Sequence, residues 1–494
     1  MKHLHFFITI VLTPCLLHAQ NVGIGISAPG AKLHIKGTAD TTQFIIDAYA
    51  IQGISKPLIK LRNSSGTDLM WIHSDHVDNT FIGRNAGRVN NAAGGGTHNT
   101  FIGATGGNAN TTGDNNTATG FGTLYFNTTG HDNSAFGDHS LYYNEGGNAN
   151  TAIGNYSLDY CTADSNTAVG YGALLFSRGG SNATAVGARA MRRYGYAEVP
   201  FKNTNTAVGY EAMRGGSDYL PDQTGNHNAA LGYQALANNT NGSYNTAVGT
   251  LAMLDNRGGD YNVAIGRRTL ENTTGSNYNT ALGANAGFVY NNGNYNTFIG
   301  YDANSNGDGY INSTAVGRGA TVLASNQIRF GNSTVGSIGG YAPWTELSDG
   351  RYKKNIAENV IGLDFIMNLR PVTYNLDIVH LANTLGEDNR VDENGRQVAF
   401  TADAETIKAR SEKSTILYTG FIAQDVEAAA KKIGYNFSGV DVPKNEGDLY
   451  GLRYSEFVVP LVKAVQEQQA TIKNQQQQID ELKALVNKLV SNKN

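Results

Sequence analysis

The sequence predicts a mainly β protein with an α-helical C-terminus, in which a repetitive β-solenoid precedes an α+β domain and a coiled coil. Three observations support this order. A unit of the type Asn-Thr-Ala-Val-Gly recurs through the middle of the chain, the composition shifts abruptly toward helical periodicity past Gly340, and a heptad pattern occupies the end of the chain. A length of 494 residues is also more than one domain usually needs.

Residues 1–19 are typical of a secretory signal peptide. Lys2 precedes an apolar run from Phe6 to Leu17, and Ala19 is a small residue at the expected cleavage site. A buried N-terminal strand is the alternative for this run. Removal of the signal would leave Cys161 as the single thiol, so no disulfide within the chain is expected. A secreted or cell-surface location is therefore predicted.

An N-terminal β segment is expected over residues 20–78. Two apolar stretches, Leu58–Arg62 and Met70–Ile72, flank the turn Ser64-Ser65-Gly66 and predict a β-hairpin.

The repeat array is predicted over residues 79–325. The unit first appears at Asn79 to Gly83 and ends on a glycine in each of fourteen copies, the last at Gly317, and nine of the thirteen intervals are 17 residues. A fixed period of this kind is the signature of a solenoid, in which each repeat forms one coil and stacks on its neighbours. The 60 glycines and the low charged fraction of 16% fit a repetitive β structure with many tight turns.

Each coil is expected to contain two short strands and a polar turn. Alternation along the first strand directs Ala168 and Val169 to opposite faces, and Gly170 fits a sharp corner with positive φ. Fourteen coils at about 4.7 Å each predict a rod roughly 65 Å long. The alanine position is filled by phenylalanine only near the ends of the array, where a solenoid needs a cap, at Phe81, Phe101 and Phe298.

Two long intervals hold insertions, at about residues 192–203 and 214–227, which we expect to be surface loops. Loops on a rigid scaffold often carry function, so a ligand-facing role and a tolerated insertion without a role are both open.

The repeat pattern, N-[ST]-x-A-[IV]-G followed by A-[LM], resembles the head repeats of trimeric autotransporter adhesins. The resemblance covers Asn79 to Gly317, although the 17-residue period is longer than is usual in that family. It implies a left-handed parallel β-roll that assembles as a homotrimer. A cell-surface glycan or a protein receptor is the partner expected of such a shaft.

Composition disfavours other classes of function. A net charge of −4 offers no basic footprint for nucleic acid, and outside the signal no stretch approaches the 18 apolar residues of a transmembrane helix. No cofactor or metal site is predicted. A tailspike-like glycan hydrolase is the alternative function, but it needs two carboxylates at a fixed separation. Acidic residues such as Asp138, Glu211 and Asp302 do not recur at one place in every coil.

After a neck over residues 326–347, four motifs follow in order. They are Ser348-Asp349-Gly350-Arg351-Tyr352-Lys353, Leu369 to Tyr374, Gly420 to Glu427, and Tyr450 to Phe457. This ordered set resembles the intramolecular chaperone auto-processing domain at the C-termini of phage endosialidases, tailspikes and long tail fibres, here over residues 348–460. In that family the domain assembles a β-rich trimer and then cuts itself off after the serine of the first motif.

The resemblance implies that Ser348 is the nucleophile, that Lys353 is its dyad partner, and that Ser348–Asp349 is the scissile bond. Tyr352 stands where Leu or Phe is usual. The chemistry is sound, because a serine needs a base and a lysine is a base only when neutral. Burial or a neighbouring cation such as Arg351 would favour the neutral amine. If burial comes only when a trimer closes, cutting would report correct assembly.

The tail, residues 461–494, is predicted to be a coiled coil. Its heptad seam alternates steps of three and four residues over Val458, Leu461, Val465, Gln468, Ile472, Gln475, Ile479, Leu482, Val486 and Leu489. Val or Ile at one seam position with Leu at the other favours two strands. The two family resemblances and the interrupting glutamines favour three.

The sequence therefore predicts a secreted or surface fibre, an adhesin-like shaft with its own C-terminal trimerisation chaperone. Self-cleavage at Ser348–Asp349 would make it at most a single-turnover serine–lysine endopeptidase without an external substrate. A fibre that keeps its C-terminal domain as an uncleaved trimer clamp is the other interpretation of the same residues.

Overall fold

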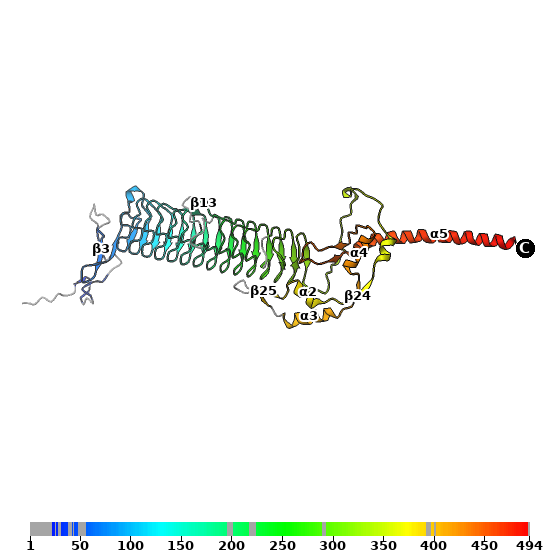
Figure 1. Ribbon diagram of the computed structural model, residues 1–494. Coiled ribbons are helices and arrows are strands. Elements are labelled where there is room, and N and C mark those ends of the chain that lie inside the picture. The colour runs from blue at the N-terminus through cyan, green and yellow to red at the C-terminus, as the bar shows by residue number, and fades with distance from the viewer. Residues whose placement is uncertain are drawn as a thin grey trace, which may run out of the picture.

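A computed structural model describes residues 22–24, 26–27, 31–37, 42, 44–47, 56–194, 201–216, 224–288, 293–391, 397–399 and 402–492. The predicted signal peptide and parts of both insertions, 195–200 and 217–223, lie outside these residues. The described chain forms an elongated rod of stacked coils, then a smaller domain with short helices, then a long helix that points away from the rod (Figure 1).

The N-terminal segment leads into the rod through antiparallel pairing. Strands β1 (Val22–Ile24) and β2 (Leu33–Ile35) pair in parallel. Strands β3 (Ile59–Arg62) and β4 (Asp68–His73) form the predicted hairpin, and β4 also pairs antiparallel with β5 (Thr80–Ile82), the first strand of the array. The hairpin thus covers the edge of the first coil.

The rod is one parallel ladder in which each coil contributes a three-residue strand. The pairing follows chain order from β5 to β23 (Ile328–Phe330), and these two strands lie at opposite ends of the rod (Figure 1). The strands between them are β6 (Thr100–Ile102), β7 (Thr117–Thr119), β8 (Ser134–Phe136), β9 (Thr151–Ile153), β10 (Thr167–Val169), β12 (Thr184–Val186), β14 (Thr206–Val208), β15 (Ala229–Leu231), β16 (Thr246–Val248), β17 (Val263–Ile265), β18 (Thr280–Leu282), β19 (Thr297–Ile299) and β21 (Thr314–Val316).

The prediction of a second strand in each coil is wrong for most coils. After the corner glycine the backbone alternates in handedness, as at Tyr156 (φ 57°) and Leu158 (φ 49°), and such a segment is not extended. Its N–H groups still reach the next coil, for example from Leu158 to the Ala173 carbonyl at 3.0 Å. Within the described residues, two further strand pairs form. The pair β20 (Asn304–Ser305) and β22 (Thr321–Val322) follows the corner glycines, whereas β11 (Gly180–Ser181) and β13 (Phe201–Lys202) pair in the polar segment that precedes the main strand of each coil.

The corner glycines stack directly on one another. Gly170 has φ 128°, and a Cβ atom built on it would lie 2.7 Å from the carbonyl carbon and oxygen of Gly187 in the next coil. Neighbouring corners repeat this contact, as Gly187 does with Gly209. Glycine is therefore required at the corner both by its backbone conformation and by the close approach of the next coil.

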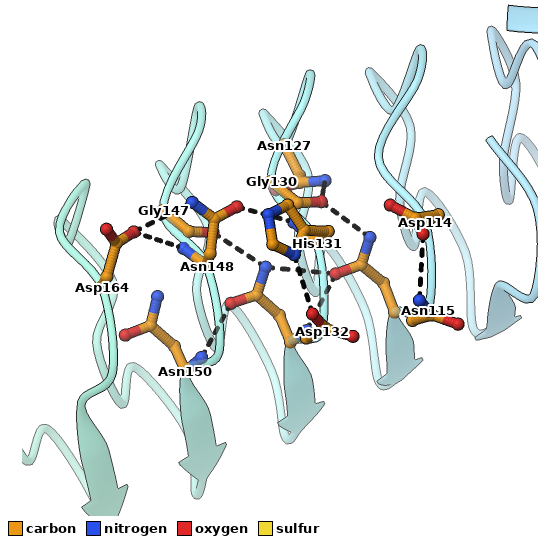
Figure 2. Close-up of polar contacts among 12 residues, drawn as sticks. Asp114, Asn115, Asn127, Gly130, His131, Asp132, Gly147, Asn148, Asn150 and Asp164 are labelled. Atoms are coloured by element: carbon orange, nitrogen blue, oxygen red, sulfur yellow. Dashed lines mark hydrogen bonds and ion pairs between the residues drawn. The ribbon is translucent and has the colours of Figure 1, made fainter. Parts of the chain in front are cut away.

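A buried asparagine ladder connects the coils just before each strand. The Asn133 side chain donates from Nδ2 to the Gly147 carbonyl at 2.8 Å, and its Oδ1 accepts the backbone N–H of Asn150 at 3.0 Å. Figure 2 labels Gly147 and Asn150. The same two bonds recur along the rod, for example from Asn262 to Ser276 and to Asn279. Each asparagine thus satisfies buried backbone groups of the next coil, which would otherwise be costly to bury.

A second column of asparagines lies on the inner side of the polar turn. Asn127 donates from Nδ2 to the Gly130 carbonyl at 3.0 Å (Figure 2). It also donates to Asn110 Oδ1 at 2.7 Å. The free thiol of Cys161 occupies this column one coil after Asn144 and is fully buried, and burial raises its pKa to about 12. The position is therefore filled by a packing cysteine without thiolate character.

Tyr194 provides buried hydrogen bonds in the part of the rod that holds the two insertions. Its hydroxyl donates to the Gly225 carbonyl at 2.6 Å and accepts from Asn239 Nδ2 at 3.0 Å. The ring is completely buried.

The predicted division of each strand into inner and outer faces is confirmed. Alanines such as Ala152 and Ala168 are fully buried, while the next apolar residue points outward, as at Ile153 (43% exposed) and Leu282 (46% exposed). Phe81, Phe101 and Phe298 fill the inner position near the rod ends, with Phe81 and Phe101 stacked at 5.3 Å. The outward residues form an apolar stripe along the strands.

The C-terminal domain has short elements around a small aromatic core. Phe365 is fully buried and contacts the rings of Phe437 and Phe457. Its helices are α1 (Leu363–Asn368), α2 (Ile378–Thr384), α3 (Ala404–Ser414), α4 (Ala423–Lys432) and α5 (Val458–Ser491). Its antiparallel pairs are β24 (Val372–Tyr374) with β27 (Tyr418–Gly420), β25 (Asn389–Val391) with β26 (Gln397–Ala399), and β28 (Val440–Asp441) with β29 (Gly451–Leu452).

Helix α5 begins inside this domain and continues beyond it. A Cβ atom on Gly362 would lie 2.6 Å from the backbone nitrogen of Ala464, and the Leu363 N–H donates to Glu467 Oε2 at 2.7 Å, so the start of α1 packs closely on α5. None of the helices in the described part of the chain is long and apolar enough to cross a membrane.

The corner contact predicts a strong effect of a single methyl group. Gly170→Ala should lower the free energy of unfolding by about 2–5 kcal/mol, because it adds backbone strain and a steric overlap with Gly187. Gly275→Ala is the matched control, since Gly275 has no positive φ and nothing lies within 4 Å of its added Cβ. Thermal unfolding followed by circular dichroism measures both variants. Equal melting temperatures for the two would contradict the stacking argument.

Candidate functional site

Ser348 and Lys353 are brought together by a short capped turn. Asp349 caps a 3-10 turn over Gly350–Tyr352 by accepting the Arg351 N–H at 2.9 Å, and the Arg351 side chain also binds the Asp349 carboxylate. The turn folds the chain back, so that Lys353 Nζ lies 2.8 Å from Ser348 Oγ. The Arg351 side chain, with its backbone N–H, holds the pKa of Asp349 below its ordinary value.

Ser348 and Lys353 lie on an exposed segment. Residues 341–348 and 350–359 are all exposed, and the chain between the rod and α1 forms a long loop that stands away from the domain core (Figure 1). A lysine acts as a base only in its neutral form, which proteins obtain by burial or by a nearby cation. The single chain brings the Lys353 amine within hydrogen-bond distance of Ser348 but does not bury it.

The other three motifs meet around the domain core. Arg370 of the second motif binds Asp425 of the third at 2.5 Å. In the fourth, the Tyr454 hydroxyl accepts the Phe421 N–H at 3.0 Å, and Tyr450 donates to Glu427 at 3.1 Å. Their spacing in the sequence therefore reflects structural pairing, whereas the Ser348 motif lies outside this cluster.

The loop between β28 and β29 docks on the last coils of the rod. Asn445 Nδ2 donates to the Leu323 carbonyl at 2.8 Å, and Gln327 Nε2 donates to Asp448 Oδ1 at 3.1 Å. Asp448 is 8% exposed. Burial works to raise its pKa, but the hydrogen bonds from Gln327 and from backbone N–H groups hold it below its ordinary value. The carboxylate is thus kept ionised at the junction.

A second contact holds the chain just past the last coil. The Glu387 carboxylate accepts the Ser333 N–H at 2.7 Å and its hydroxyl at 2.6 Å. Arg410 binds the same carboxylate at 3.0 Å, and Lys413 Nζ donates to the carbonyls of Ser333 and Val335 at 2.8 and 2.6 Å. Together with the Asn445–Asp448 loop, this contact forms a two-point clamp on the C-terminal end of the rod.

The heptad seam of α5 is exposed throughout the single chain. Leu461 is 45% exposed, Ile472 50%, and Leu482 62%. One 34-residue helix with an unpaired apolar seam presents a surface suited to other helices. The coiled coil stays a prediction.

Sequence reasoning missed the clamp residues and one buried acid, Asp159. The clamp left no signal, because Glu387, Lys413 and Asp448 are far apart in the chain and belong to no repeat. Asp159 could have been found from the 17-residue period. It stands 17 residues after Tyr142, at a position where the preceding coils have an aromatic residue. The described residues contain no group of three or more His, Cys, Asp or Glu side chains that could hold a metal ion.

Comparison with known proteins supports the C-terminal assignment. Residues 348–435 match the family described as chaperone of endosialidase, and the match begins at Ser348. The search of curated proteins found no match. The matched segment covers the first three motifs and begins after the exposed segment that follows the rod. The C-terminal region is therefore a domain of the chaperone-of-endosialidase family, preceded in this chain by a parallel β-solenoid.

Proposed function

We propose that the protein is an exported, homotrimeric fibre shaft whose C-terminal domain guides its assembly and then cuts itself off at Ser348–Asp349. The observation that carries the chaperone role is the clamp, because it touches only the finished end of the rod. The family match supports an intramolecular chaperone. Export rests on the signal-like residues 1–19, and a glycan or protein receptor is the partner proposed for the shaft.

Two exposed apolar surfaces support self-association. The rod carries the outward apolar stripe along its strands, and α5 carries its seam. Surfaces of this extent are unusual on a monomer and indicate an interface. Because the coils of one chain are nearly identical, the stripe alone would allow chains to slip by one coil. A clamp and a coiled coil at one end would align the chains before they associate.

The proposal that the chains associate through the heptad seam of α5 is tested by placing charged residues in that seam. The double variant Ile472→Asp and Ile479→Asp should convert trimers to monomers or aggregates, because it places charges in the core of the coiled coil. Because the proposed cut would remove the seam, the parent protein and all variants for this test carry Ser348→Ala. Multi-angle light scattering of that parent protein should give three times the mass of one mature chain. Gln476→Asp and Gln477→Asp, outside the predicted seam, form the matched control. A parent protein with the mass of one chain would refute the trimer.

The chemistry of the proposed cut implies that it occurs between chains. The carbonyl of the Ser348–Asp349 bond belongs to Ser348 itself, and attack by its own Oγ would close a strained four-membered ring. A serine from one chain attacking the carbonyl of residue 348 in a neighbour has no such obstacle. Lys353 would take the Oγ proton, the C–N bond would break, and the Asp349 amine would leave with that proton. Water would then hydrolyse the ester.

Mixed trimers test this proposal. When a tagged Ser348→Ala chain is expressed alone, we expect one full-length band on a denaturing gel and an intact mass. When it is expressed together with the parent chain, the tagged chain should be cut, because a neighbour supplies the serine. Lys353→Met should abolish cutting in the homogeneous protein, and Lys354→Met serves as its control.

Three results separate the alternatives. An uncut parent chain would favour the uncleaved trimer clamp. Cutting of homogeneous Ser348→Ala protein would remove Ser348 as the nucleophile. A tagged Ser348→Ala chain that stays intact beside a parent chain that is cut would contradict transfer between chains.

A further inference from the structure

A patch of aromatic rings covers one face of the rod between β7 and β10. Tyr125 and Tyr142 stack at 5.0 Å in one row, and Phe126, Tyr143 and Tyr160 stack at 5.2 and 4.6 Å in a second row. The two rows are nearly perpendicular, with 80° between Tyr142 and Tyr143. We call these five rings, with Asp159, the ring patch.

Asp159 interrupts the first row. It stands one coil after Tyr142, where the register would place a third ring, and its backbone carbonyl accepts the Tyr143 N–H at 2.8 Å. An aspartate side chain is much shorter than a tyrosine side chain, so its carboxyl lies below the level of the rings. Asp159 is 7% exposed, while Tyr143 is 37% exposed.

The Asp159 carboxyl lacks a hydrogen-bond donor. Its Oδ1 atom is buried and has no partner, and burying such a group without compensation is costly. Glu211, further along the rod, is a buried carboxylate whose charge is compensated in the usual way. It is 6% exposed and binds Arg189 at 3.3 Å, Arg214 at 3.2 Å and Gln234 at 2.8 Å. Asp159 has no equivalent cation.

The surroundings of Asp159 favour positive charge. The Asp138 carboxylate is close enough to act on Asp159 electrostatically, and the ring faces carry negative potential. His139 pairs with Asp138 at 2.9 Å, and the Arg178 guanidinium lies 6.0 Å from the centre of the Tyr160 ring. A ligand with positive charge and N–H groups would supply the donor that Oδ1 lacks and would lie against the rings.

We propose that the ring patch is a binding site for a protonated primary amine, with Asp159 as its counter-ion and Tyr142 and Tyr160 as its aromatic walls. A lysine side chain of a receptor protein and an amino sugar of a glycan both present this group. The site does not depend on assembly or on cleavage, so it can fail or succeed independently of the function proposed above.

The site has a defined dependence on pH. Burial, with the Asp138 charge adding to it, raises the pKa of Asp159 to about 7 in the free protein. Only the carboxylate attracts the amine, so affinity should rise as pH increases through about 7 and level off above it. The other titratable and charged groups facing the patch are Asp138, His139, Arg178 and the tyrosine hydroxyls. Asp159→Asn should remove the part of the pH dependence that belongs to Asp159.

The test uses the full mature chain and ligand-observed NMR titration at pH 8. n-Butylammonium should bind with a dissociation constant on the order of millimolar, and 1-butanol, which lacks the charge, should bind at least about tenfold more weakly. Tetramethylammonium, which lacks N–H groups, should also bind more weakly. Glucosamine against N-acetylglucosamine, and acetyl-lysine amide against acetyl-norleucine amide, distinguish a glycan from a protein source.

Two variants separate binding from folding. Asp159→Asn should weaken n-butylammonium binding about tenfold while leaving the melting temperature equal or higher, since it removes a buried unpartnered charge. Asp132→Asn, an exposed acid of a neighbouring turn, should change neither. Equal binding of 1-butanol, unchanged binding by Asp159→Asn, or a lower melting temperature for that variant would overturn the proposal. So would a reduced oligomeric state in Asp159→Asn or Tyr142→Leu, because the patch would then be an interface between copies.

Discussion

The close contact between corner glycines determines the geometry of the rod. Gly170 and Gly187 bring the backbones of two coils into direct contact, which only residues without a Cβ allow. This contact sets the coil spacing and therefore brings Asn133 under Asn150 and Tyr125 under Tyr142. The buried ladders, the parallel strands and the ring rows all depend on it. A one-residue shift in the pairing of two strands would turn the buried alanines outward and separate these contacts.

The two ends of the rod differ from its interior because each end coil has a neighbour on one side only. A parallel ladder leaves unpaired edges at its first and last coils, and exposed edges invite wrong pairing. At the start the β3–β4 hairpin covers the edge. At the other end the clamp, with Asn445 on Leu323 and Glu387 on Ser333, contacts the last coils. Because neighbouring coils are nearly equivalent, a device that contacts only the last coils and the chain just past them can define the register of the whole array.

The repeat made most of the rod predictable. The position of Ala168 inside, Val169 outside and Gly170 at a corner followed from alternation and conformational freedom. The prediction of a second strand was wrong because residues in that segment, such as Tyr156 and Leu158, adopt positive φ. Neither tyrosine nor leucine normally indicates that conformation. Tertiary stacking imposes that conformation, so a local pattern could not reveal it.

The candidate site was predictable only in part. The five-residue spacing and the family resemblance placed Ser348 near Lys353, and the structure shows them 2.8 Å apart. The clamp depends on contacts such as Gln327 with Asp448, which are 121 residues apart and follow no period. Asp159 can be recognised as unusual only when the coils are aligned, because the alignment shows that it occupies a position held by an aromatic residue in the preceding coils.

The central claim is that the C-terminal domain sets the register of the rod and is dispensable once the rod has formed. Refolding measures this directly. A Ser348→Ala chain with a protease site inserted in the exposed segment 341–347 can be folded and then cut, and both cut and uncut proteins can be unfolded in guanidinium and diluted. We predict that the uncut chain regains its circular dichroism and its oligomeric mass, whereas the rod, purified from its C-terminal domain after cutting, does not. Equal recovery by that rod would contradict the account.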